Sequence, residues 1–254
     1  MKDDALLAEW LKEEQAPFVG WDFSHINDRT IEEKPPWSYA AMARSLMRGA
    51  SSALDLGTGG GEILAELRDA YPARMTATEA YPPNVEIADA RLGPLGVTVV
   101  PYEASEATAP LPFPDGSYDV IISRHEAYDA REVARVLTPR GHFLTQQVTG
   151  TSHAALLQEF GVVPQFPDVT ADRLASDLRT ANLVVDDVRD WRGWHFFKDV
   201  GALVYYLRAV PWDVPDFSVT RHRDVLLGLQ RRLERDGQLG FQIGRFLIAA
   251  HKPA

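Results

Sequence analysis

The sequence predicts an α/β fold, in which a mostly parallel sheet carries helices on both faces. An apolar segment at residues 53–56 has the composition of a buried strand and runs directly into a glycine-rich turn. After the turn, apolar residues recur at helical spacing, at Ile63, Leu64, Leu67 and Tyr71. The alternation of strand and helix continues to residue 148, and such connections are right-handed crossovers between parallel strands.

The glycine-rich turn at residues 54–62 reads Leu-Asp-Leu-Gly-Thr-Gly-Gly-Gly-Glu. It lies between the carboxyl end of a strand and the amino end of a helix, where open α/β sheets bind ligands. A dinucleotide fingerprint would need glycine where Glu62 or Leu64 stands, and a phosphate-binding P-loop would need a lysine that the turn lacks. Two readings stay open: a tight turn without a ligand, or the pattern acid-x-Gly-x-Gly-x-Gly carried by Asp55, Gly57, Gly59 and Gly61.

Two further strands are predicted to end in acidic residues. Residues 75–78 read as a strand ending in Glu79, whose carboxylate can accept hydrogen bonds from two ribose hydroxyls. Residues 97–100 read as the next strand, followed by Glu103 and Ala104. Two longer motifs complete this part of the chain: Leu-Pro-Phe-Pro-Asp-Gly-Ser-Tyr-Asp-Val-Ile-Ile at 111–122 and Glu-Val-Ala-Arg-Val-Leu-Thr-Pro-Arg-Gly-His-Phe at 132–143.

These four motifs, in this order over residues 53–148, resemble those of the class I S-adenosylmethionine-dependent methyltransferases, including ubiquinone- and menaquinone-biosynthesis-type proteins. The resemblance implies a Rossmann-like sheet of seven strands, with the last strand antiparallel between the fifth and sixth. It also implies S-adenosyl-L-methionine as cofactor. The sequence departs from the family where Pro-Gly-Gly before the fifth strand is Pro139-Arg140-Gly141.

The resemblance assigns each part of the cofactor to residues of this chain. The amino-acid end would be held by the turn, the ribose by the end of the second strand, and the adenine by the end of the third. The residues after the fourth strand would form the pocket floor. In this order the cofactor-binding residues are Asp55, Gly57, Thr58, Gly59 and Gly61; Glu79 and Ala80; Glu103 and Ala104; and Ser123 and Arg124.

His125 is the candidate general base, because it follows the fourth strand, where the resembling family places catalytic residues. An imidazole with its ordinary pKa can remove a proton at neutral pH. The alternative is a packing or helix-capping histidine. A His-Glu-x-x-His zinc site would need histidine at Asp129, and the chain has no cysteine, so we predict no metal site.

Four other side chains are candidates for the substrate pocket. Trp37 and Tyr39 precede the first strand of the motif, and aromatic faces attract a sulfonium cation. Glu126 follows His125, and Gln146 lies at the carboxyl end of the fifth strand. Each also has an ordinary structural reading, as packing or as a partner for nearby backbone.

We expect a single domain over residues 1–254. Residues 1–50 would form an N-terminal helical cap, 51–150 the cofactor-binding half, and 151–254 a C-terminal half with a small aromatic insertion at 191–240 before the last strand. Cap and insertion are each read either as core packing or as a lid on the pocket. Other expected helices are 3–15, 39–48, 84–92, 170–180, 199–208 and 223–235, and the late strands are 142–148, 183–188 and 241–251.

The net charge of −10 and pI of about 5.2 make a nucleic-acid partner unlikely, because phosphates would be repelled. No signal peptide or membrane-spanning run is evident, so we expect a cytoplasmic protein without a membrane partner. The predicted function is methyl transfer to a small-molecule acceptor. The alternatives are a non-catalytic S-adenosylmethionine-binding protein and an RNA-directed methyltransferase; a nicotinamide oxidoreductase is disfavoured by Glu62. Nothing in the sequence specifies the oligomeric state.

Overall fold

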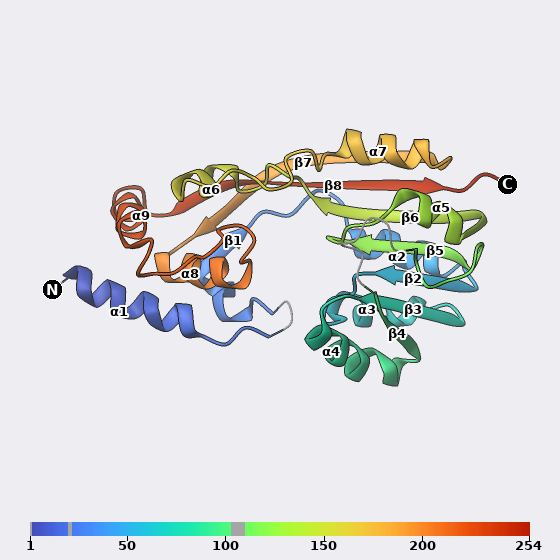
Figure 1. Ribbon diagram of the computed structural model, residues 1–254, viewed down its shortest axis with the longest axis horizontal. Coiled ribbons are helices and arrows are strands. Elements are labelled where there is room, and N and C mark those ends of the chain that lie inside the picture. The colour runs from blue at the N-terminus through green and yellow to red at the C-terminus, as the bar shows by residue number, and fades with distance from the viewer. Residues whose placement is uncertain (1, 20–21, 103–109) are drawn as a thin grey trace. The chain divides into compact units, whose positions relative to one another are not determined.

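The computed structural model describes residues 2–19, 22–102 and 110–254. The chain divides into two compact units, each built from three segments (Figure 1). Unit 1 contains residues 1–35, 149–168 and 191–244, and unit 2 contains residues 36–148, 169–190 and 245–254. Expectations for Glu103 and Ala104 lie outside the described residues. The reading of the chain as a single domain stays a prediction.

Unit 2 is built on parallel strands. The strands are β2 (Ser52–Leu56), β3 (Arg74–Glu79), β4 (Val97–Pro101), β5 (Tyr118–Arg124) and β6 (Leu137–Val148), with the first part of β7 (Val184–Phe197) and the last part of β8 (Leu239–His251). Strands β4, β3, β2, β5 and β6 are parallel neighbours in that order, and β8 pairs antiparallel with β6. In the full sheet β8 lies between β6 and β7, as predicted. The strand order reverses between β2 and β5, so the loops after these two strands open onto a crevice.

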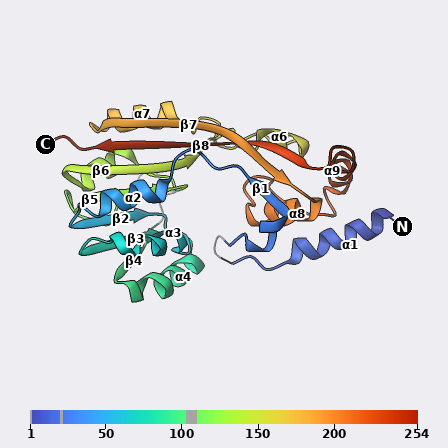
Figure 2. The same ribbon diagram turned by 180° about the vertical axis from the view of Figure 1, so that it is seen from behind.

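Helices cover both faces of the unit 2 sheet, as predicted (Figures 1 and 2). Helices α5 (Ala130–Val136) and α7 (Ala171–Thr180) pack on one face with inward residues such as Ile121 and Phe143. On the other face, Met47, Leu64 and Leu92 project from the helices α2 (Tyr39–Met47), α3 (Glu62–Glu66) and α4 (Pro82–Leu92). Two 3-10 helices, η2 (Arg68–Ala70) and η3 (Gly93–Leu95), follow α3 and α4.

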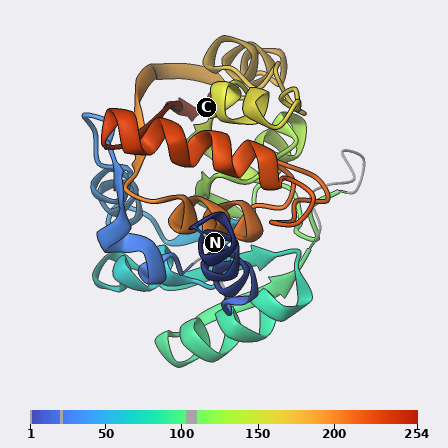
Figure 3. The same ribbon diagram turned by 90° about the vertical axis from the view of Figure 1, so that its left-hand side faces the viewer.

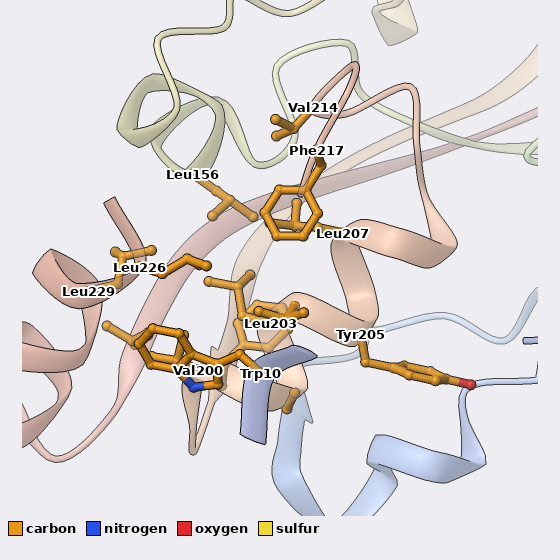
Figure 4. Close-up of a cluster of buried hydrophobic side chains, with 14 of the residues drawn as sticks. Trp10, Leu156, Val200, Leu203, Tyr205, Leu207, Val214, Phe217, Leu226 and Leu229 are labelled. Atoms are coloured by element: carbon orange, nitrogen blue, oxygen red, sulfur yellow. The ribbon is translucent and has the colours of Figure 1, made fainter. Parts of the chain in front are cut away.

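Unit 1 is a second hydrophobic core built around α8 (Val200–Ala209). This helix is buried on nearly all sides, which suits its almost wholly apolar sequence. Figure 3 looks onto α8, α1 (Lys2–Gln15) and α9 (Arg223–Asp236), and Figure 4 shows Trp10 of α1 in the same cluster as Leu203 of α8. The unit also contains α6 (Ala154–Glu159), the 3-10 helix η1 (Ser24–Arg29), β1 (Thr30–Glu32), and the remaining parts of β7 and β8.

The structure corrects three details of the predicted fold. The sheet has eight strands and not seven, because β1 pairs antiparallel with the end of β7. Residues 191–197, expected in an insertion, continue β7, since Gly193, His195 and Phe197 alternate inward with more exposed neighbours. The helix after the glycine turn ends early, at Glu66, and passes into η2. Among the described residues, every helix falls short of the length or apolarity needed to cross a membrane.

Candidate active site

The glycine turn after β2 has the backbone that its glycines predict. Gly57, Gly59 and Gly61 have φ values of +68°, +61° and +80°, in the left-handed region that side chains disfavour. The turn is tied to the neighbouring strand β3: the Thr58 N–H donates to the Thr78 carbonyl oxygen at 2.9 Å. A Cβ atom at Gly57 would also collide with the Glu126 side chain, so this position needs glycine for both conformation and space.

Glu79, at the end of β3, holds the same turn through its carboxylate. The Gly59 N–H donates to Oε2 at 2.7 Å, and the Tyr81 N–H donates to Oε1 at 2.9 Å. A carboxylate offers about four acceptor positions, so two remain for another donor. Glu79 is therefore fixed in place beside the turn and still able to accept hydrogen bonds. Ala80 directly follows it and is half-buried.

Asp55, the last acid of β2, is buried and carries a perturbed carboxyl group. Burial raises its pKa from 3.8 to about 7, the Thr58 hydroxyl and the Arg124 charge oppose the rise, and Glu79 and Glu126 add to it. Only 8% of Asp55 is exposed, so the desolvation that causes the shift is consistent with its accessible surface. The site thus holds a carboxyl group balanced between its two protonation states at neutral pH.

Glu126, from the loop after β5, lies against the glycine turn. Burial raises its pKa to about 6, a hydrogen bond from the Ala127 N–H opposes the rise, and the charge of Glu79 adds to it. Three carboxyl groups therefore gather around one turn, and the charges of Glu79 and Glu126 make the ionised form of Asp55 less stable. A cationic ligand would relieve this repulsion.

A pocket opens beside Asp55 and encloses about 320 Å³, including space open to solvent. Its walls carry the buried hydroxyl Tyr39 Oη, which has no hydrogen-bond partner among the described residues. Buried polar atoms are rarely left unpaired, so this hydroxyl indicates a missing partner. The lining residues are Tyr39, Asp55, Gly57, Thr58, Ile63, Leu64, Leu67, Ile122 and Arg124.

His125 lies in the loop after β5 with a φ of +63°, which is unusual for a residue other than glycine. Its backbone N–H donates to the Gln146 carbonyl oxygen at 2.9 Å. Surrounding protein atoms and the charges of Arg124 and Arg245 lower its pKa well below the usual range. The imidazole is therefore neutral at pH 7, on a residue that is exposed to solvent.

Trp37 and Gln146, both predicted pocket residues, are joined by a hydrogen bond. The Trp37 indole N–H donates to Gln146 Oε1 at 2.8 Å, and Gln146 Nε2 lies 3.4 Å from His125 Nε2. Gln147 was not among the predicted site residues, although two adjacent glutamines near the carboxyl end of a strand are a signal in the sequence. Its amide donates to the Glu126 carbonyl oxygen at 2.9 Å. Ser123 is fully buried, with its hydroxyl 3.4 Å from the same carbonyl oxygen.

The structure therefore brings together most of the predicted site residues at the ends of β2, β3, β5 and β6. Among the residues it describes, no group of three or more histidine, aspartate or glutamate side chains could hold a metal ion. Sites of this arrangement are suited to a small cationic ligand placed over the glycine turn.

Comparison with known proteins agrees with this geometry. Residues 54–145 match the family model described as a methyltransferase domain, and this segment contains the glycine turn, Glu79 and the loop after β5. Residues 54–145 of this chain are therefore similar to a methyltransferase domain. Over 98 residues the chain is 35% identical to the uncharacterized methyltransferase YcgJ of Bacillus subtilis (strain 168). That match spans 36% of this chain and 38% of the YcgJ chain.

Solved structures share the methyltransferase fold over a larger part of the chain. The YcgJ structure aligns with a TM-score of 0.59 and 20% identity, covering 85% of this chain and 98% of YcgJ. A Bacillus halodurans C-125 structure, described as that of a methyltransferase, aligns with a TM-score of 0.60 and 14% identity, covering 85% and 99%. The [4+2]-cyclase SpnF aligns with a TM-score of 0.53 and 16% identity, covering 85% of this chain and 80% of the cyclase. At these identities the likeness concerns the fold.

Proposed function

We propose that this protein transfers the methyl group of S-adenosyl-L-methionine to a small-molecule acceptor and releases S-adenosylhomocysteine. The observation that carries the proposal is the combination, beside one turn, of crowded carboxyl groups and a buried hydroxyl without a hydrogen-bond partner, that of Tyr39. Asp55 and Glu126 have pKa values raised to about 7 and about 6, and Tyr39 and Thr58 present hydroxyls to the same pocket.

The residues fit this cofactor chemically. Its sulfonium and ammonium groups are cations, and either would reduce the repulsion among Asp55, Glu79 and Glu126. The glycine turn allows a ligand to approach bare backbone, since Gly57, Gly59 and Gly61 lack side chains there. Glu79 would hold the ribose through its free acceptor positions, and Asp55, Thr58 and the turn would hold the amino-acid end. The assignments of Ala80, Glu103, Ala104, Ser123 and Arg124 stay predictions.

When bound, S-adenosyl-L-methionine supplies a methyl carbon on a good leaving group, so the protein's contribution is mainly alignment. The ties between the turn and Thr78 and Glu79 hold the binding residues in place before the ligand arrives. Ile63, Leu64 and Ile122 line the pocket with apolar surface that excludes water. Each of these features reduces how far protein groups and water must rearrange around the reacting atoms during methyl transfer.

We place the acceptor beside His125, which keeps the general-base role that the sequence suggested. A hydroxyl or a neutral amine with an N–H becomes strongly acidic as its lone pair bonds to the methyl carbon. A neutral imidazole with a lowered pKa is therefore a sufficient base, and it is present in the neutral form at pH 7. The net charge of −10 supports a small molecule over a nucleic acid.

A second candidate is a protein that binds the cofactor without transferring its methyl group. The likeness to the SpnF cyclase favours keeping this candidate, since a [4+2] cyclisation is not a methyl transfer. In that case S-adenosylmethionine would bind at the turn, and His125 would serve a different ligand or none.

Binding is tested by thermal unfolding with S-adenosylhomocysteine and, separately, with NADH. At a hundredfold excess over its dissociation constant, a ligand stabilises by about 2.7 kcal/mol, a rise in Tm of roughly 5 to 10 °C for a chain of this size. We expect the rise with S-adenosylhomocysteine alone. No rise with it, at millimolar concentration, would withdraw the proposal.

Turnover is tested with S-adenosylmethionine labelled in the methyl group, incubated with cell extract and then separated by size. We expect the label in the small-molecule fraction, dependent on the active protein and absent with Gly57→Ala. Label in RNA would support the RNA-directed alternative. Binding without formation of S-adenosylhomocysteine, across all fractions, would support the non-catalytic candidate.

A further inference from the structure

Three side chains from separate parts of unit 2 form a hydrogen-bonded series that ends at His125. Trp37, just before α2, donates its indole N–H to Gln146 Oε1 at 2.8 Å. Gln146 lies in β6, is 6% exposed, and brings its amide nitrogen to 3.4 Å from His125 Nε2.

The chemistry of these groups fixes the direction of each bond. An indole N–H can only donate, so the Gln146 atom facing Trp37 must be the carbonyl oxygen, and the amide NH₂ must face His125. An NH₂ group can only donate, so His125 Nε2 must be the unprotonated nitrogen. In the neutral imidazole, the ring proton therefore lies on Nδ1.

The charges around His125 favour the neutral form of its imidazole. Arg124 on the preceding position and Arg245 on β8 face the ring with positive charge, and no carboxylate is among the groups that shift its pKa. The backbone is held as well, since the Gln146 carbonyl oxygen accepts from the His125 N–H and Gln147 fixes the next carbonyl. The left-handed φ of His125 is thus maintained by the same strand that orients its ring.

We infer that Trp37 and Gln146 are positioning residues that hold His125 with its proton on Nδ1, so that Nε2 is the nitrogen that receives the acceptor's proton. The inference rests on the proposed function for its catalytic consequence. The hydrogen bond from Gln146 Nε2 to His125 Nε2 is long, at 3.4 Å. The O–H or N–H of the acceptor can therefore replace it at little cost, while Gln146 keeps its hydrogen bond from Trp37.

The proton balance is simple. Nε2 receives the proton that the acceptor atom loses as its lone pair forms a bond to the methyl carbon, while the carbon–sulfur bond breaks with its electrons on sulfur. The resulting imidazolium, next to Arg124 and Arg245, then returns its proton to water. Because the two positive charges disfavour the imidazolium, the base resets readily for the next turnover.

The tautomer can be measured without any activity, by nitrogen NMR of protein labelled in histidine rings, with the His125 signal assigned by its loss in His125→Asn. At pH 7 we expect the proton on Nδ1. Trp37→Phe removes the donor that orients Gln146, so we expect a mixture of tautomers. Gln146→Glu replaces the amide by an acceptor, so we expect the proton on Nε2 and a raised pKa. Trp194→Phe, a tryptophan of unit 1 that is 44% exposed, should leave the signal unchanged.

The proton on Nε2 in the unmodified protein, or an unchanged tautomer in both Trp37→Phe and Gln146→Glu, would overturn the inference. This holds whether or not the protein methylates anything.

The pH profile tests the catalytic consequence. In the unmodified protein at saturating cofactor, whose cationic groups hold Asp55 and Glu126 in their ionised forms, kcat should be flat from about pH 6.5 to 8.5, since His125 is neutral throughout. In Gln146→Glu we expect kcat to fall by roughly 10- to 100-fold at pH 7, with KM for the cofactor unchanged and a new loss of rate towards acid. Equal kcat in the two proteins would contradict the role of Nε2. Absence of turnover in the unmodified protein would instead count against the proposed function, and the NMR result would still decide the tautomer.

Discussion

Each unit contains a cluster of buried polar side chains, and the two clusters differ in whether their hydrogen-bonding atoms have partners. In unit 1, His153 is 5% exposed and both of its ring nitrogens have partners: Nε2 lies 3.2 Å from His195 Nδ1, and Nδ1 lies 3.2 Å from the Tyr206 hydroxyl. In unit 2, Tyr39 is 6% exposed, and its hydroxyl has no partner among the described residues.

One buried carboxyl group in each unit, Asp213 in unit 1 and Asp55 in unit 2, shows the same difference between the two clusters. Asp213 in unit 1 has a pKa raised to about 6 by burial, but the Tyr206 hydroxyl stabilises its charge and no other acid contributes. The charge of Asp55 in unit 2 is destabilised by burial, is stabilised by Thr58 and Arg124, and is destabilised further by Glu79 and Glu126, so two other acids act on it. A polar cluster that is complete in itself supports the fold, whereas one left incomplete is suited to a ligand. Burial alone does not distinguish the two.

The largest effect is expected at the glycine turn. Gly57→Ala should weaken binding of S-adenosylhomocysteine by roughly 100-fold or more, because the new Cβ meets a left-handed φ and the Glu126 side chain. Calorimetric titration measures this. Gly116→Ala is the matched control, since Gly116 has a φ of +59° and open space around it. Equal losses in the two variants would mean that backbone strain, and not the site, is responsible.

Asp55→Asn should make the protein more stable while weakening ligand binding. The pKa of Asp55 is raised in the folded state, so the folded protein binds its proton more tightly and stability falls as pH rises from about 4 to 7. Asparagine removes this loss, so the free energy of unfolding should increase by roughly 2 to 4 kcal/mol at pH 8 and by much less near pH 5. Urea unfolding at the two pH values provides the measurement.

Asp119→Asn is the control with the opposite sign. Burial of Asp119 is outweighed by hydrogen bonds from Ser51, Thr138 and Ser52, so its pKa is lowered. Its ionised form stabilises the fold above the ordinary pKa, and the variant should be less stable at pH 8. A stabilised Asp119→Asn, or an Asp55→Asn that loses stability, would contradict the contrast between the two carboxylates.

In unit 1, Tyr206→Phe should cost about 1 to 3 kcal/mol in the free energy of unfolding, because it removes a partner of both His153 and Asp213. Binding of S-adenosylhomocysteine should be unchanged. If binding were lost at unchanged stability, the cluster around His153 would belong to a ligand site and the comparison would fail.

The smallest effect is expected for the hydroxyls of Tyr39 and Tyr128, neither of which has a hydrogen-bond partner among the described residues. Tyr39→Phe and Tyr128→Phe should each stabilise the ligand-free protein by about 1 kcal/mol, since each removes a buried hydroxyl with no hydrogen bond. Tyr39 lines the pocket, whereas Tyr128 packs edge-on against Phe143 at 4.9 Å between ring centroids. Only Tyr39→Phe should weaken ligand binding, as thermal shifts at several ligand concentrations would reveal.

The sequence predicted the parts of this structure that depend on local pattern. The turn at Gly57, the strand ending in Glu79 and the position of β8 each follow from residue spacing or from the resemblance it supports. The protonation of Asp55 and the link from Trp37 to Gln146 could not be predicted, because both depend on groups far apart in the chain. For the same reason the continuation of β7 through Trp191 was missed: its pairing with β1 involves residues more than 160 positions away.

The segmented construction of unit 1 sets an order in which the protein can be made. Helix α1 places Trp10 in a core whose central helix, α8, begins only at Val200. During synthesis at roughly 5 to 20 residues per second, α1 therefore waits about 10 to 40 s for its partner. Throughout that interval its apolar side is available to chaperones, and the glycine turn is already outside the ribosome before unit 1 can form.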